Sequence, residues 1–134
     1  KITAQRIHGK ALMKGIRLIW LKAANPKLEE WRLGVHAKVS DTYNSVFDPK
    51  GPRRVKDDRE GIDRRIMTRL TSRALDRAEK IAENAARGKF PSQESVERID
   101  FSYSSLALRI QSNNKWEKIE QQRLLTLKVA KTVK

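Results

Sequence analysis

The chain has 134 residues, of which 30 are lysine or arginine and 16 are aspartate or glutamate, so its formal net charge is +14. The absence of cysteine excludes disulfides, thiol catalysis and thiolate metal sites, and no run approaches the roughly 18 apolar residues that span a bilayer. We therefore expect a cytoplasmic protein with one compact core, whose positive charge attracts polyanions such as nucleic acid. Because the first residue is not Met, we also expect a piece of a longer chain.

A first helix is predicted for residues 4–24, where apolar side chains cover one broad side. The basic residues of its other side are Arg6, Lys10, Lys14 and Arg17. This basic face is compatible with a solvated surface, a phosphate contact or membrane association. Asn25-Pro26 ends the helix, because proline lacks the backbone N–H and disfavours helical geometry in the residue before it. A second helix, with a scaffold role, is predicted for about residues 27–46 from the spacing of its apolar positions.

Residues 48–58 contain two prolines, a glycine and charges of both signs, a composition typical of an exposed loop. We expect this loop to become ordered on contact with a phosphate backbone. The residues that we predict to contact phosphate are Arg53, Arg54 and Lys56.

A third, long helix is predicted for residues 61–87, with Gly88 as its C-terminal cap. Its predicted buried seam consists of Ile62, Ile66, Leu70, Ala74, Ala78, Ile81 and Ala85. Beside the seam, arginines recur every four residues as Arg65, Arg69, Arg73 and Arg77, and we call this set the arginine stripe. It is either a solvated face or a phosphate contact, and the acidic residues Asp76, Glu79 and Glu83 could neutralise part of it.

Residues 96–103 alternate in the period of a strand that buries one face. Ile99, Phe101 and Tyr103 are its apolar positions, and Arg98, Asp100 and Ser102 are polar. A lone strand leaves its backbone groups unpaired, and the rest of the chain offers no convincing partner. We therefore expect the same strand of a second copy to pair with it, antiparallel about a two-fold axis. The outward residues Arg98, Asp100 and Ser102 would then contact bases in the major groove, although an exposed strand of ordinary polar residues is the alternative.

Two short helices are predicted after this strand, at about residues 103–111 and from about residue 115 onward. Asn113-Asn114 suits the turn between them, where free backbone N–H groups at a helix start could cap or bind phosphate. The residues predicted to contact phosphate at this point are Asn113, Asn114 and Lys115. The second helix is apolar on two sides, which predicts a partner subunit.

Several short segments resemble one protein family. They are Ala4-Gln-Arg-Ile-His-Gly9, Ile19-Trp-Leu-Lys-Ala-Ala-Asn-Pro26, Trp31 with Leu33, Phe101-Ser-Tyr-Ser, and Leu124-Leu-Thr126. In this order they resemble the AcaB-like transcriptional regulators encoded on conjugative plasmids and integrating conjugative elements. The resemblance implies a bacterial ribbon-helix-helix activator of conjugative-transfer genes that works as a dimer or higher oligomer. The family has a proline near the start of the first helix after the strand, whereas this chain has Ser102-Tyr-Ser-Ser there.

The resulting prediction is a mainly α protein. A helical accessory region of about three helices occupies residues 1–92. A ribbon-helix-helix module of one strand and two helices, with an intersubunit two-stranded ribbon, occupies residues 93–134. Its predicted function is sequence-specific binding of double-stranded DNA as a transcriptional regulator. The expected partners are DNA, a second copy of the chain and RNA polymerase, with no membrane, cofactor, metal or small-molecule substrate.

Three alternatives remain beside this function. A relaxosome accessory protein of the same fold would hold transfer-origin DNA, and the sequence does not separate it from a regulator. An RNA-binding module fits the charge, but the expected aromatic stacking platform is missing because the three phenylalanines do not cluster. A DNA-processing enzyme is disfavoured, since His8 and His36 are too far apart in sequence to predict a metal site beside a nucleophilic tyrosine.

Overall fold

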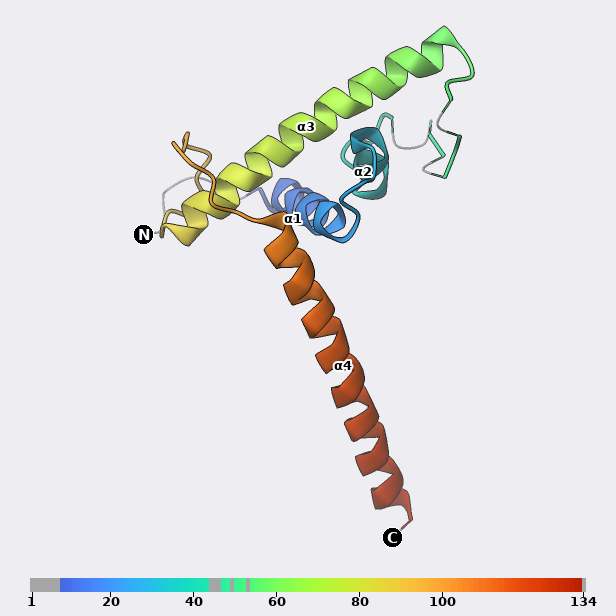
Figure 1. Ribbon diagram of the computed structural model, residues 1–134, viewed down its shortest axis with the longest axis vertical. Helices are drawn as coiled ribbons and strands as arrows, with labels where there is room; N and C mark the ends of the chain where they lie inside the picture. Colours follow the sequence, from blue (N-terminus) through green and yellow to red (C-terminus); the bar gives the residue numbers. More distant parts are fainter. Residues whose placement is uncertain (1–7, 44–46, 49, 53, 134) are drawn as a thin grey trace. The chain divides into compact units, whose positions relative to one another are not determined.

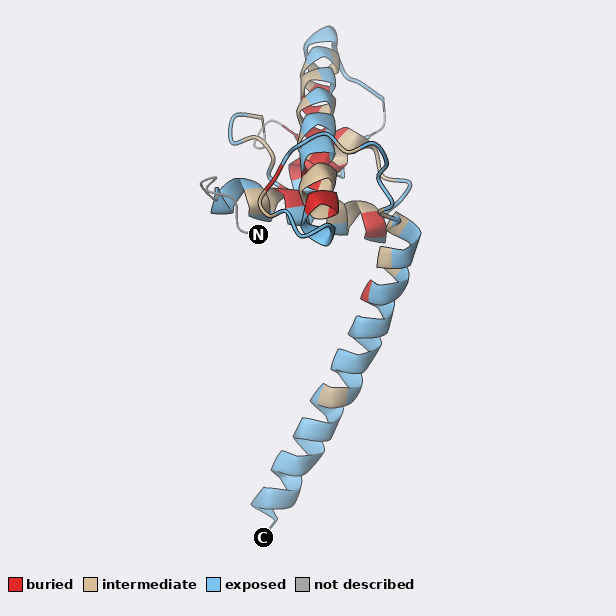
Figure 2. Ribbon diagram, turned by 90° about the vertical axis from the view of Figure 1, so that its left-hand side faces the viewer, coloured by how far each residue is buried: buried red, intermediate tan, exposed pale blue. Residues whose placement is uncertain are grey.

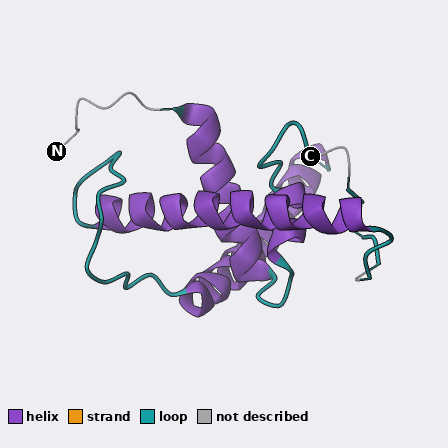
Figure 3. Cartoon of the chain, turned by 90° about the horizontal axis from the view of Figure 1, so that it is seen from above, coloured by secondary structure: helices purple, strands orange, loops and turns teal. Residues whose placement is uncertain are grey.

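The computed structural model describes residues 8–43, 47–48, 50–52 and 54–133. Its helices are α1 (Gly9–Ala24), α2 (Glu30–His36), α3 (Asp58–Ala86) and α4 (Tyr103–Thr132) (Figure 1). No strand is drawn in these ranges (Figure 3), so the prediction of a mainly α protein is confirmed. The chain divides into two units, Lys1–Phe101 and Ser102–Lys134, which we describe separately.

The core of the first unit lies where α1 and α2 pack on α3. One cluster joins Leu18 of α1, Leu33 of α2 and Leu75 of α3, all at most 3% exposed. A second cluster adds Trp31 of α2, whose ring centroid lies 5.6 Å from that of Phe47. Figure 2 shows most of the buried residues of the first unit gathered on these three helices. Burying such apolar side chains is the main driving force that holds the helices together.

Two glycines let α1 and α2 approach α3 closely. A Cβ atom added to Gly15 of α1 would lie 3.0 Å from the Cβ of Ala78, and one added to Gly34 of α2 would overlap Oγ1 of Thr71. Both glycines are buried, and Thr71 is fully buried with its hydroxyl donating to the Met67 carbonyl. Side chains at either glycine would therefore push the helices apart.

The helix boundaries follow local signals. The first helix ends at Ala24, before Asn25-Pro26, as predicted. The second helix was predicted to be longer: α2 stops at His36, and Lys38 adopts a positive φ of 54° that a continuing helix cannot contain. The third helix starts earlier than predicted, because the Asp57 side chain accepts a hydrogen bond from the Glu60 amide and caps it.

The buried face of α3 differs from the predicted seam. Of the predicted seam, Ala78 is buried, whereas Ile62 and Ala85 are exposed. The other buried residues in the middle of α3 are Met67, Thr71 and Leu75. The predicted helical period was right, but the buried face is rotated about the axis of α3. The close contacts of Gly15 with Ala78 and of Gly34 with Thr71 fix the face that meets α1 and α2. The other seam residues, including Leu70, Ala74 and Ile81, are only half-buried.

A single 30-residue helix, α4, replaces the two short helices predicted after residue 102. Asn113 and Asn114 lie inside it, so the predicted turn between the two helices is wrong. An asparagine inside a helix costs only about 0.7 kcal/mol relative to alanine, whereas a break creates new ends with unpaired backbone groups. No glycine or proline occurs in α4, so nothing in the sequence forces that break.

Candidate nucleic-acid interface

The arginine stripe lies along α3 and is exposed at all four positions, Arg65, Arg69, Arg73 and Arg77. Successive members are four residues apart, which is about 6 Å along a helix, so the stripe is about 18 Å long. Within the part of the chain that the structure describes, none of the four makes an ion pair or a hydrogen bond through its side chain. Four guanidinium groups on one helix are thus available to an external anion.

The acidic residues that could neutralise the stripe pair with other cations. Asp76 lies 3.0 Å from Nζ of Lys80, and Glu83 lies 3.2 Å from Nη2 of Arg87. The third acidic residue, Glu79, lies 3.9 Å from Nζ of Lys22 on α1. Among the described side chains, no carboxylate therefore forms an ion pair with an arginine of the stripe. The first two pairs have i, i+4 spacing with the acid first, a signal that can be read from the sequence.

The loop before α3 is held at its C-terminal end by two contacts. Nη2 of Arg64 donates to the Pro52 carbonyl at 2.9 Å, and the Lys56 amide donates to a Glu60 carboxylate oxygen at 2.6 Å. The Lys56 hydrogen bond, helped by the Arg64 guanidinium, holds the pKa of Glu60 below its usual 4.5. Two predicted phosphate contacts, Arg54 and Lys56, are exposed residues of this loop, and the third, Arg53, lies outside the described residues.

Arg64 also stacks on the buried Trp31 of α2. Its guanidinium carbon lies 4.4 Å from the indole centroid, and the guanidinium of Arg32 lies at the same distance from that ring. Arg64 additionally pairs with Glu60 at 2.9 Å. One side chain thus joins the loop, the start of α3 and α2, and places the basic loop next to the end of α3 from which the arginine stripe runs.

The three residues predicted to contact bases lie just before α4. Arg98 and Asp100 form an ion pair of 2.9 Å, with side chains 85% and 63% exposed. The carbonyl of Arg98 accepts a hydrogen bond from Arg87, which ties this segment to α3. Ser102 caps α4 by accepting from the Ser105 amide, so its hydroxyl is used within the chain. The three side chains are close in sequence and exposed.

Asn113, Asn114 and Lys115 were expected at a helix start, and this position is wrong. They lie in the middle of α4, where the backbone N–H groups are already used by the helix. Only their exposed side chains can contact an anion.

The basic face of the first helix is divided. Lys10 and Arg17 are exposed on α1, whereas Lys14 is half-buried and its Nζ lies 3.4 Å from the Val39 carbonyl. Arg6 lies outside the described residues. In the described part of the chain, no three His, Asp or Glu residues come together as metal ligands, and no helix there is long and apolar enough to cross a membrane.

Comparison of the chain with protein-family models, with curated proteins and with solved structures found no match.

Proposed function

We propose that this chain is a sequence-specific regulator that binds double-stranded DNA, an activator of conjugative-transfer genes that works as a dimer. The observation that carries the proposal is the arginine stripe, Arg65, Arg69, Arg73 and Arg77, whose acidic neighbours are paired with other cations. Guanidinium groups bind phosphate through paired N–H donors, and such contacts position a protein on DNA without reading its sequence.

The dimensions of the stripe suit a duplex. A groove of B-DNA presents phosphates on both of its walls, and each strand carries one charge per 3.4 Å of axis. Four guanidinium groups over about 18 Å can therefore contact several phosphates of one site. Arg54 and Lys56, in the loop that precedes α3, would extend this surface.

Dimerisation is proposed from two exposed segments. Residues 95–100 make no backbone–backbone hydrogen bond with any described residue. Ile99, one of these residues, is 39% exposed. Apart from the Arg98 carbonyl, which accepts from Arg87, the backbone groups of this segment can pair with a second copy and form a two-stranded ribbon. Arg98 and Asp100 would then exchange their exposed ion pair, worth at most about 1 kcal/mol, for contacts to base edges, with Ser102 beside them.

The second exposed segment is α4, the one helix of the second unit. Its large apolar side chains that are at least half exposed are Leu108, Trp116, Ile119, Leu124, Leu125, Leu127 and Val129. They lie on more than one side of the helix, so a single neighbour within one chain would not cover them. A second copy is the partner that the proposal assigns to them.

The salt dependence of DNA binding tests the proposal. Each phosphate contact contributes about 0.9 to the slope of log K against log salt concentration. Changing Arg65, Arg69 and Arg73 to Gln should therefore lower the slope by about 2.7 on a random duplex, measured by fluorescence anisotropy. The matched control changes both members of two pairs, Lys80→Gln with Asp76→Asn and Lys22→Gln with Glu79→Gln, which removes paired cations without releasing a carboxylate beside the stripe and should leave the slope nearly unchanged. Equal slope changes in the two variants would refute the stripe as the phosphate contact.

A relaxosome accessory role uses the same DNA-binding surface and remains the second candidate. A footprint on conjugative-plasmid DNA separates the two functions. Protection at promoters supports the regulator, whereas protection confined to the transfer origin supports the accessory role.

A further inference from the structure

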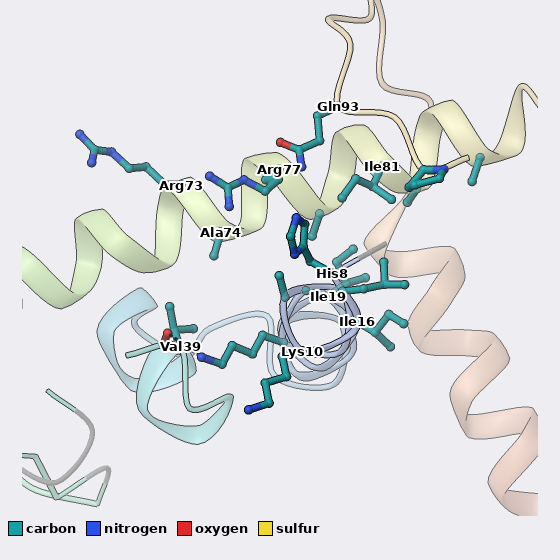
Figure 4. Close-up of a pocket in the computed structure, with 18 of the residues that line it drawn as sticks. His8, Lys10, Ile16, Ile19, Val39, Arg73, Ala74, Arg77, Ile81 and Gln93 are labelled. Carbon is teal, nitrogen blue, oxygen red and sulfur yellow. Dashed lines mark hydrogen bonds between the residues drawn. The ribbon is translucent and has the colours of Figure 1, made fainter. Parts of the chain in front are cut away.

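A large cavity lies between α1 and α3 in the first unit, with a volume of about 1190 Å³ (Figure 4). Its walls are apolar. Leu12, Ile16 and Ile19 contribute from α1, and the residues of the predicted seam that α1 and α2 leave only half-buried, Leu70 and Ile81 among them, contribute from α3. The cavity therefore explains why an apolar seam with helical spacing is only partly buried. The apolar residues of α1 and of this seam line the cavity together and leave it unfilled.

The rim of the cavity is positively charged. Lys10 extends from α1, and Arg73 and Arg77 extend from α3 (Figure 4). Lys14 of α1 also lines the cavity. None of the described residues that line it is an aspartate or a glutamate. An apolar interior with a rim of one sign selects an occupant that is apolar on one side and negatively charged at its edges.

A second copy of this chain does not meet that requirement. The exposed helix α4 carries six lysine or arginine residues and only two glutamates, so it would bring positive charge to a positive rim. A small apolar acid fits poorly as well, because pockets for such ligands bury 70–90% of the ligand surface. This cavity is open, and several of its lining residues, including Lys10, Ile16 and Arg77, are exposed.

We propose that this cavity binds an acidic amphipathic helix of a protein partner. The helix would lay its apolar stripe against Ile16, Ile19 and Ile81 and place its carboxylates beside Lys10 and Arg77. An open groove between helices suits this mode of recognition, in which only one face of the bound helix is buried. Binding does not require DNA. The site shares Arg73 and Arg77 with the arginine stripe, however, so DNA affinity is measured alongside peptide affinity.

The test uses the full chain and synthetic helical peptides of about 15 residues, roughly 22 Å long. One peptide carries leucine at i, i+3, i+4 and i+7 positions with glutamates at the flanks. The control has the same leucines with lysine in place of glutamate. We expect fluorescence anisotropy to show saturable binding of the acidic peptide, at least about tenfold tighter than the basic one. Equal affinities for the two peptides, or no binding of the acidic peptide, would overturn the proposal. Oleate, a small apolar acid, is tested in parallel, and binding of oleate without binding of either peptide would also overturn it.

Two arginines of the stripe provide the matched variants. Arg77 lines the cavity, whereas Arg65, on the same helix, does not. Arg77→Glu should weaken the acidic peptide about tenfold, and Arg65→Glu should leave its affinity within about twofold. Both changes should weaken DNA binding if the stripe contacts phosphate. Loss of peptide binding to the same extent in both variants would reject the cavity as its site. Unchanged DNA affinity in both would reject the DNA proposal alone.

Discussion

The close approach of α2 to α3 at Gly34 predicts the effect of adding one methyl group. In an isolated helix, Gly→Ala is stabilising by about 1 kcal/mol, because alanine loses less backbone entropy. At Gly34 the new Cβ would overlap Oγ1 of Thr71 and lie 3.3 Å from Sδ of Met67. Thr71 and Met67 are fully buried, so neither side chain can swing into solvent. We therefore expect Gly34→Ala to destabilise the protein.

The magnitude follows from two opposing terms. Forcing an extra methyl group into a packed core costs about 1–3 kcal/mol, and the gain in helix propensity offsets about 1 kcal/mol of it. The overlap with Oγ1 of Thr71 places the cost at the upper end of that range, so the expected net destabilisation is about 2 kcal/mol. For a unit of about 100 residues this corresponds to a fall in Tm of roughly 8 to 16 °C.

Thermal unfolding followed by circular dichroism provides the assay, with Gly61→Ala as the matched control. Gly61 lies in α3, and its Cβ would meet only a Val55 methyl at the ordinary distance of 3.8 Å. That variant should be neutral or more stable. The double variant with Gly34→Ala and Thr71→Ala should be about 1 kcal/mol more stable than the sum of the two single effects predicts, because Thr71→Ala removes the overlapping hydroxyl. A Gly34→Ala protein as stable as the Gly61→Ala protein would refute the packing argument.

Three further predictions concern the caps and the proposed DNA contacts. Asp57→Ala should destabilise α3 by about 1 kcal/mol in urea unfolding, since the cap to the Glu60 amide is lost; Asp57→Ser, which can still cap, should lose much less. The lowered pKa of Glu60 stabilises the fold above pH 4.5, and that stability is lost as the pH falls through the folded-state pKa; Glu60→Gln should therefore flatten the dependence of Tm on pH below 4.5, and an unchanged profile would contradict the hydrogen bond from Lys56. Arg98→Ala should weaken binding to the specific operator by about 1–3 kcal/mol and spare most of the affinity for random duplex, and an equal loss on both would count against base reading.

Local signals in the sequence determined the end of the first helix and the placing of the arginine stripe. Asn25-Pro26 ends α1 because a proline removes a backbone donor wherever it occurs. The four-residue repeat of the arginine stripe placed its members on one side of α3, since helical periodicity is a property of the chain alone. The basic composition, which favours a polyanionic partner, is likewise independent of the fold.

Only the tertiary structure decided which face of α3 is buried and which charges remain unpaired. Several faces of α3 carry apolar residues with helical spacing, and the close approaches at Gly15 and Gly34 select the one that contacts α1 and α2. The pairing of Glu79 with Lys22 joins two helices, so no local rule could have assigned it. Continuity of α4 through Asn113 was also missed, because a weak local preference for a turn does not outweigh the hydrogen bonds of an unbroken helix.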